Sequence, residues 1–221
     1  MTSSPRILSV NLGRGVERPY ASGPETAIDK RPAPTIEVRD PGPREGGLGS
    51  GIVGDDIGDR KHHGGAHQAV YAYAREDLDW WADELGRELH NGQFGENITT
   101  LGVDCTHARI GELWRIGEVA LQVQGPRIPC ATFAGHLGER GWVKRFTAEG
   151  RVGAYLSVVR PGALQPEDAL TIERPDHDVD ILLVFRAFTG DLVAARRVVD
   201  AHVLNPKDHT ELEETLRQRA G

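Results

Sequence analysis

The apolar residues before position 175 fall into many short runs, and this pattern limits what the chain can fold into. The runs are four to eight residues long, a length typical of β-strands, and Gly- or Pro-containing turns separate them. The 221-residue chain holds 27 Gly and 13 Pro, enough to end each run. Strands are predicted at residues 6–12, 35–40 and 69–73, and within segments 96–102, 112–117, 118–124, 151–160 and 168–174. The pattern favours a mainly β fold, built as a barrel or a strongly twisted sheet.

Helical spacing appears in two places. Residues 75–89 place apolar side chains three and four positions apart, which predicts one helix among the strands. After Pro175 the pattern changes, and apolar residues at helical spacing predict helices over 181–192 and 195–203. Asn205 and Pro206 resemble a cap and a first-turn residue, so a third helix is predicted after them. We therefore divide the chain into a β domain, 1–175, and a three-helix extension, 176–221.

Charge and hydropathy exclude several classes of partner. The formal net charge is −7, and tight binding to nucleic acid or anionic lipid needs surplus Lys and Arg. No apolar run approaches the roughly 20 residues that span a bilayer, and the first residues do not resemble a signal peptide. We expect a cytoplasmic protein that binds neither nucleic acid nor membranes.

The densest cluster of polar chemistry lies at residues 60–67. Arg60, Lys61 and His63 lead directly into Gly64 and Gly65, so cations and bare backbone amides are available to an anion. A solvated surface turn explains the same residues equally well. His63 and His67 are four residues apart, a spacing that binds zinc on a helix, but the glycine pair disfavours a helix and no third ligand stands at a suitable spacing.

The most unusual stretch is residues 124–130, where Pro126 and Pro129 bracket Arg127 and the loop ends in Cys130. A thiol beside Arg and a predicted helix N-terminus gains thiolate character, and thiolate attacks carbon or binds soft metals. A buried Cys that only packs is the alternative. The other cysteine, Cys105, has no such setting and is expected to be structural. Glu96 and Asn97 follow a glycine turn. Their side chains either hydrogen-bond a ligand or hold the turn in place.

Four blocks occur here in a fixed order: 48–55 with 60–73, 92–102, 110–130 and 150–164. The ordered set resembles the MOSC domains related to the C-terminal part of molybdenum cofactor sulfurases, and the chain is similar to stand-alone members of the YiiM type. The tail after Pro175 resembles the three-helix extension of that subgroup. The chain departs from the pattern at Gln124-Gly125, where Ser-Gln is common, and at Ala66 and His67, where Pro and an acidic residue are common.

The resemblance implies a MOSC β-barrel with peripheral helices and a pocket for the molybdopterin form of molybdenum cofactor. Cys130 matches the family cysteine that ligates molybdenum or carries sulfur, and Arg127 lies in its loop. The remaining matching positions are expected to bind cofactor: Lys61, His63, Gly64, Gly65, Asn97 and Thr99. The resemblance also allows pyridoxal phosphate as another phosphate-bearing ligand.

The implied activity is reduction of N-hydroxylated bases or related N-oxygenated small molecules. Cys130 then ligates the metal, and an external reductase supplies electrons, because the sequence shows no flavin, haem or iron–sulfur motif. One alternative is a sulfur carrier that uses a persulfide on Cys130. Another is a non-enzymatic cofactor-binding or interaction protein. We also expect a homodimer, because Ile181, Val184, Phe185 and Phe188 form an apolar face that must be covered.

Overall fold

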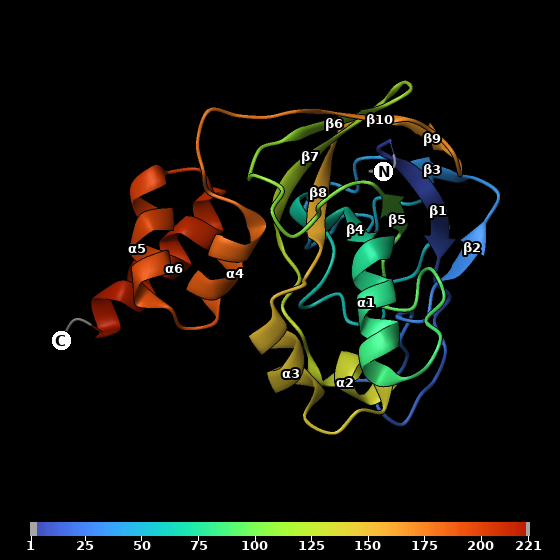
Figure 1. Cartoon of the computed structure of the whole chain (residues 1–221), viewed down its shortest axis with the longest axis horizontal. Coiled ribbons are helices and arrows are strands. Elements are labelled where there is room, and N and C mark those ends of the chain that lie inside the picture. The colour runs from blue at the N-terminus through green and yellow to red at the C-terminus, as the bar shows by residue number, and fades with distance from the viewer. Residues whose placement is uncertain (1–3, 220–221) are drawn as a thin grey trace.

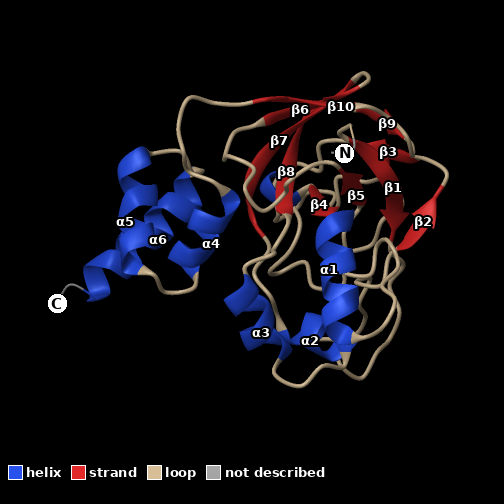
Figure 2. Ribbon diagram, in the orientation of Figure 1, coloured by secondary structure: helices blue, strands red, loops and turns tan. Residues whose placement is uncertain are grey.

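A computed structural model describes residues 4–219 of the chain. Its centre is one mixed sheet of eight strands, in the order β10-β6-β7-β8-β4-β5-β1-β2 (Figure 2). Neighbouring strands are antiparallel except β4 and β5, which run parallel. A second, two-stranded sheet pairs β3 with β9. The expectation of a mainly β first part is confirmed.

Each predicted strand is present. The bounds are β1 Arg6–Leu12, β3 Ile36–Val38, β4 Val70–Ala74, β5 Ile98–Leu101, β6 Leu113–Ile116, β7 Val119–Pro126, β8 Ala154–Arg160 and β10 Leu170–Glu173. Two strands of three residues were missed, β2 Arg31–Ala33 and β9 Gly162–Leu164. They are too short for an alternating pattern to develop, and backbone pairing with a neighbour defines them instead.

The barrel itself is not confirmed. Among residues 4–219 the strand order has two ends, β10 and β2, and these two strands do not pair. The start of β1 does approach the segment before β10, because the Ile7 N–H donates to the Asp168 carbonyl at 3.0 Å and the Leu170 N–H to the Pro5 carbonyl at 3.0 Å. One isolated bridge, Arg6 with Ala169, joins them. The sheet is thus strongly curved, while continuous closure remains a prediction.

Three helices lie at one end of the sheet, α1 Arg75–Leu85, α2 Ala131–Leu137 and α3 Trp142–Glu149 (Figure 1). Helix α1 ends four residues earlier than predicted because Gly86 adopts the left-handed conformation that stops a helix. Helix α3 was not predicted, although Trp142 and Phe146 stand four residues apart and both are buried. The aromatic rings of α1, α2 and α3 pack together below the sheet.

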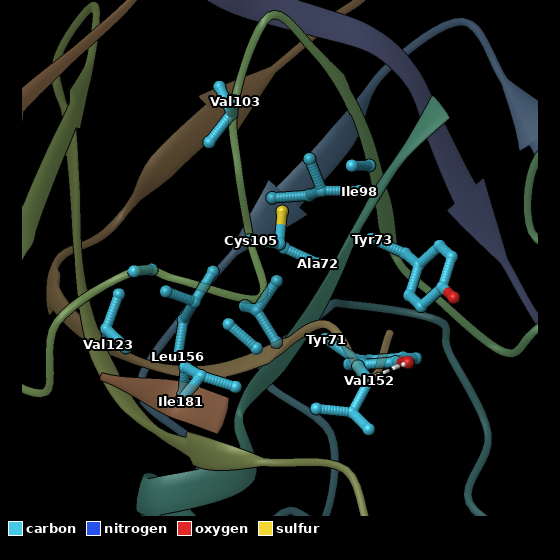
Figure 3. Close-up of a cluster of buried hydrophobic side chains, with 14 of the residues drawn as sticks. Tyr71, Ala72, Tyr73, Ile98, Val103, Cys105, Val123, Val152, Leu156 and Ile181 are labelled. Carbon is cyan, nitrogen blue, oxygen red and sulfur yellow. Dashed lines mark hydrogen bonds between the residues drawn. The ribbon is translucent and has the colours of Figure 1, made fainter. Parts of the chain in front are cut away.

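The core of the β domain contains Cys105, which is completely buried (Figure 3). Its sulfur lies 3.4 Å from the Thr100 hydroxyl, and burial raises the pKa of the thiol. An uncharged buried thiol behaves as a small apolar side chain, so the structural role expected for Cys105 is confirmed. In the same region Tyr71 donates its hydroxyl to the Val152 carbonyl at 2.8 Å.

The C-terminal extension holds α4 Ile181–Phe188, α5 Leu192–Ala201 and α6 Pro206–Arg219, set to one side of the sheet (Figure 1). The helix predicted over 181–192 is wrong at its end, because the chain turns at Gly190 and Asp191 caps a new helix. Asn205 accepts a hydrogen bond from the Asp208 N–H at 3.1 Å, as a cap should.

The apolar face of α4 is covered within the chain. Ile181, Val184 and Phe185 are at most 1% exposed and belong to the same core as the sheet. The Ile181 N–H donates to the Ala108 carbonyl at 2.9 Å, which ties the start of α4 to the β domain. The apolar face of α4 therefore gives no reason to expect a dimer. The homodimer stays a prediction, and so does the division of the chain at Pro175.

Candidate functional site

One cavity of about 630 Å³ opens between the 13–34 segment, the 55–64 segment and the 126–130 loop. Five of the eight predicted site residues line it: His63, Gly64, Asn97, Arg127 and Cys130. They come from parts of the chain up to 67 positions apart, from His63 to Cys130. A cavity of this size accommodates a cofactor or a small substrate.

The other three predicted residues do not line the cavity. Lys61 is exposed, and its backbone N–H donates to Asp59. Thr99 is completely buried and donates its hydroxyl to Glu96 at 3.0 Å, so it supports the site from below. Gly65 is buried with φ 80°, and a Cβ there would stand 2.7 Å from the Arg44 backbone nitrogen. Only glycine fits at that position without moving the chain.

Arg127 is the buried cation of the cavity. It is 6% exposed, and its guanidinium lies over the rings of Phe133 at 4.5 Å and Tyr71 at 5.2 Å. Its Nε has no hydrogen-bond partner, and no carboxylate of residues 4–219 forms an ion pair with it. A buried charge without a counterion is costly, so this residue is arranged for an anion that enters the cavity.

Cys130 stands at the start of α2 and lines the cavity together with Pro129 and Ile128. The predicted helix N-terminus after Cys130 is present. The thiol is partly exposed, in contrast to that of Cys105. Access to the cavity and the nearby charge of Arg127 are what a ligating or nucleophilic thiolate requires.

His63 is a neutral member of the site. Burial, followed by repulsion from Arg127, lowers the pKa of His63 to about 4. At neutral pH the ring therefore offers one N–H donor and one acceptor and carries no positive charge. The buried cation of the cavity is therefore Arg127 and not this histidine. The next residue, Gly64, has φ 88°, and a Cβ there would be 2.8 Å from the Gly49 carbonyl oxygen.

A buried ion pair that no sequence pattern indicates also lines the cavity. Lys30 pairs with Asp55, and the two side chains are 8% and 2% exposed. Asp55 also accepts from Asn97 Nδ2 at 3.0 Å, Ser50 Oγ at 2.8 Å and the Gly13 N–H at 2.7 Å. This network fixes Asn97, and its members are too far apart in sequence for spacing to reveal it.

The Gly- and Pro-rich 13–34 segment forms one wall of the cavity, and part of it packs on α2. Ser22 donates its N–H to the Thr132 hydroxyl at 3.0 Å, and the Tyr20 hydroxyl lies 3.4 Å from His136 Nδ1. A Cβ on Gly135 would be 2.3 Å from the Tyr20 Cβ, so the packing of this wall requires glycine there. The segment thus covers the start of α2 next to Cys130.

Glu96 is a fully buried carboxylate beneath the cavity. It accepts hydrogen bonds from the N–H groups of Gly92 and Phe94 and from the Thr99 hydroxyl. Burial raises the pKa of Glu96 to about 7, although these hydrogen bonds lower it. Asn11 joins the same network through Thr99 Oγ1 at 3.1 Å. Glu96 therefore holds the turn that presents Asn97, which agrees with the structural alternative.

We predict that Glu96→Gln lowers the free energy of unfolding by about 1–3 kcal/mol at pH 5, because the amide cannot accept from Phe94. The pH profile also changes. Folded Glu96 keeps its proton up to about pH 7, whereas unfolded Glu loses it near 4.5. Stability of the natural protein therefore falls as pH rises between these values.

In Glu96→Gln, this contribution to the fall of the free energy of unfolding with pH is expected to be absent. Urea unfolding at several pH values measures the slope. Glu118→Gln is the control, because that side chain is 91% exposed. Equal slopes in both variants contradict the assignment.

Residues 4–219 contain neither a ready-made metal site nor a membrane-spanning helix. No group of three or more His, Cys, Asp or Glu side chains is placed to hold a metal ion there. His67 lies away from the cavity and contacts Gln124, so the His63–His67 pair does not form. No helix in that range is long and apolar enough to cross a bilayer.

The chain belongs to the MOSC domain family, whose model matches residues 59–171. The matched range includes His63, Asn97, Arg127 and Cys130 of the cavity. The protein is 33% identical to the uncharacterized protein YflK of Bacillus subtilis over 72% of this chain and 69% of that protein. It is 31% identical to the protein YiiM of Escherichia coli over 59% of this chain and 60% of that protein.

Solved structures show the same fold over nearly the whole chain. YiiM from Geobacillus stearothermophilus aligns with a TM-score of 0.73 at 23% identity, covering 96% of this chain and 99% of that one. YiiM from Escherichia coli aligns with a TM-score of 0.69 at 20% identity, covering 99% and 94%. The resemblance to the YiiM type is confirmed. A Gibberella moniliformis protein named "Reductase" is 27% identical over 72% of this chain but only 29% of its own length.

Two departures from the family pattern meet in space. His67 Nδ1 lies 3.1 Å from Gln124 Oε1. Gln124 in turn donates to the Ser157 hydroxyl at 2.9 Å. His67 and Gln124, which stand where the resemblance leads us to expect an acidic residue and Ser, are therefore bonded to each other, and they lie outside the cavity that holds Cys130.

Proposed function

We propose that the protein is a molybdenum-cofactor-binding reductase that removes oxygen from N-hydroxylated bases or related N-oxygenated compounds. The observation that carries the proposal is Arg127, a buried cation without a counterion, in the same cavity as the accessible Cys130 thiol. Membership of the MOSC family and the distant relative named "Reductase" support the same chemistry.

The residues of the cavity fit the cofactor. The pterin form carries a phosphate, and an unpaired guanidinium is the side chain best suited to bind one. Neutral His63 and the fixed Asn97 amide offer hydrogen bonds to the polar edge of a pterin. Cys130 offers a soft thiolate, the ligand type that molybdenum accepts. Outside the lining, Thr99 supports the site through Glu96, Gly65 packs against Arg44, and Lys61 is exposed.

The overall reaction converts R–NHOH, two protons and two electrons into R–NH₂ and water. When bound, a molybdenum centre supplies the two-electron chemistry. The chain's residues bind and orient: Arg127 holds an anion, Asn97 is fixed by Asp55, and the 13–34 segment shields the Cys130 side of the cavity from water. The electrons come from a separate reductase.

We expect Cys130→Ser to abolish reduction of an N-hydroxylated purine by the loaded protein while the thermal unfolding midpoint stays within a few degrees. The side chain is partly exposed, so its loss leaves the core intact. Product formation with a reduced dye as electron donor measures this. Cys105→Ala is the matched control, which keeps activity and loses stability because Cys105 is in the core. A fully active Cys130→Ser variant contradicts the proposal.

The same thiol also supports the second candidate, a sulfur carrier. The cavity leaves Cys130 accessible to a donor and to an acceptor. Mass spectrometry that finds one extra sulfur on Cys130, in protein that holds no molybdenum and reduces no substrate, would favour this candidate.

A further inference from the structure

The cavity wall holds a second polar atom without a partner, and this atom belongs to Gln68. Gln68 lines the cavity and ends a short 3₁₀ helix, η1, Ala66–Gln68. Its Oε1 is buried and has no hydrogen-bond partner among residues 4–219. Of the buried side-chain atoms in that range that lack a partner, only Arg127 Nε and Gln68 Oε1 belong to residues that line the cavity. A buried amide oxygen without a donor is costly, so a ligand that brings the donor supplies what the empty site lacks.

The backbone around Gln68 is fixed, whereas its amide oxygen is not. The Gln68 N–H donates to the Gly65 carbonyl at 3.0 Å, and the carbonyl of the next residue, Ala69, accepts from the Gly51 N–H at 2.8 Å. Helix η1 also lies against β7 and β8, and β7 leads directly into Arg127. The terminal torsion of a Gln side chain is broad, so a small rotation turns the unbonded oxygen toward a ligand while the backbone stays in place.

The other side-chain amide of the cavity, Asn97, is already engaged. Its Nδ2 donates to Asp55 Oδ2 at 3.0 Å and to the Asn11 carbonyl at 3.4 Å. Its Oδ1 accepts from the Tyr71 N–H at 3.3 Å. A side-chain amide has two donor and two acceptor positions, so a single acceptor position of Asn97 is left for a ligand. Gln68 keeps its whole amide oxygen for that purpose, although the family resemblance does not point to it.

We propose that Gln68 binds the heterocycle of the cofactor by accepting a hydrogen bond from a pterin N–H, while Arg127 holds the phosphate. The inference rests on the proposed function, which supplies the cofactor. A phosphate presents acceptors, which suit a guanidinium, and a pterin carries an amino group and a ring N–H, which suit an amide oxygen. The two unpartnered atoms of the cavity thus match two different parts of one ligand. Gln68 selects for the heterocycle and not for the anion.

Gln68→Met tests this assignment, because Met has a similar length and only a weak acceptor. Fluorescence titration of the cofactor-free full chain with pterin measures binding of the heterocycle, and calorimetric titration with inorganic phosphate measures binding of the anion. We expect Gln68→Met to weaken pterin binding about 5- to 20-fold and to leave phosphate binding unchanged. Arg127→Met is expected to show the opposite pattern. The urea unfolding midpoint of empty Gln68→Met is expected to be no lower than that of the natural protein, because Oε1 makes no bond there.

Gln165→Met is the matched control, because Gln165 is exposed and does not line the cavity. The inference is overturned if the natural protein binds no pterin, or if Gln68→Met and Gln165→Met bind it equally well. A lowered unfolding midpoint in Gln68→Met would also overturn it, because Gln68 would then be a structural residue. Selective loss of pterin binding in a protein that reduces no N-hydroxylated compound would instead count against the proposed function alone. The two failures are therefore distinguishable.

Discussion

Arg127→Met is expected to make the cofactor-free protein more stable and, at the same time, to weaken its binding of the cofactor. The guanidinium is buried on Phe133 and Tyr71 without a counterion. Replacing buried ion pairs by apolar side chains of similar volume is often neutral or stabilising by about 1–4 kcal/mol, and we expect a gain of that order when a buried cation without a counterion is removed. Loss of a charge-assisted hydrogen bond to phosphate costs about 1.5–3 kcal/mol of binding, which is roughly 10- to 100-fold in affinity.

The two effects are measured separately. Urea unfolding of cofactor-free protein gives the stability, and the pterin content after purification gives retention of the cofactor. Arg115→Met is the control, because Arg115 is exposed and paired with Glu173 on the far strands of the sheet. If Arg127→Met destabilises the empty protein and keeps its pterin, then Arg127 is a packing residue and the site has been misassigned.

The second large effect concerns the buried pair that fixes Asn97. Lys30→Met leaves Asp55 as an uncompensated carboxylate that is 2% exposed. Removing one partner of a buried ion pair costs about 3–5 kcal/mol, and we expect a loss of that size in the free energy of unfolding. A Lys30→Met, Asp55→Asn double variant should recover part of the loss, because no charge is then left buried.

Arg197→Met serves as the exposed comparison. Arg197 pairs with Asp178 at the surface, and such pairs contribute about 0–1 kcal/mol. A loss of under 1 kcal/mol in Lys30→Met, or no recovery in the double variant, would show that the Lys30–Asp55 pair does not hold the cavity wall in place.

Local patterns predicted the strands well because alternation is a local property. The bounds of β1 agree with the sequence at both ends, and those of β5 lie inside the predicted segment. Helix ends were less certain, since they depend on single residues such as Gly86 and Gly190. The position of α4 against the sheet could not be predicted, because an apolar helix face does not specify what covers it.

The candidate site was predicted in part. Motif positions identified His63, Gly64, Asn97, Arg127 and Cys130, which the fold brings together around one cavity. The sequence could not show that Arg127 lacks a counterion, because that depends on every group around it. It also gave no sign of the Lys30–Asp55 pair, since contacts between distant segments leave no regular spacing. The sequence also could not show that His63 is neutral, because burial and Arg127 together decide its protonation.

We propose that this cavity holds molybdenum cofactor through Cys130. The most direct test is the molybdenum and pterin content of the protein, purified without oxygen from a host that makes the cofactor, beside that of Cys130→Ser. The account predicts molybdenum near one per chain in the natural protein and its loss in the variant. Equal molybdenum in both proteins, or none in either with a persulfide on Cys130, would contradict it.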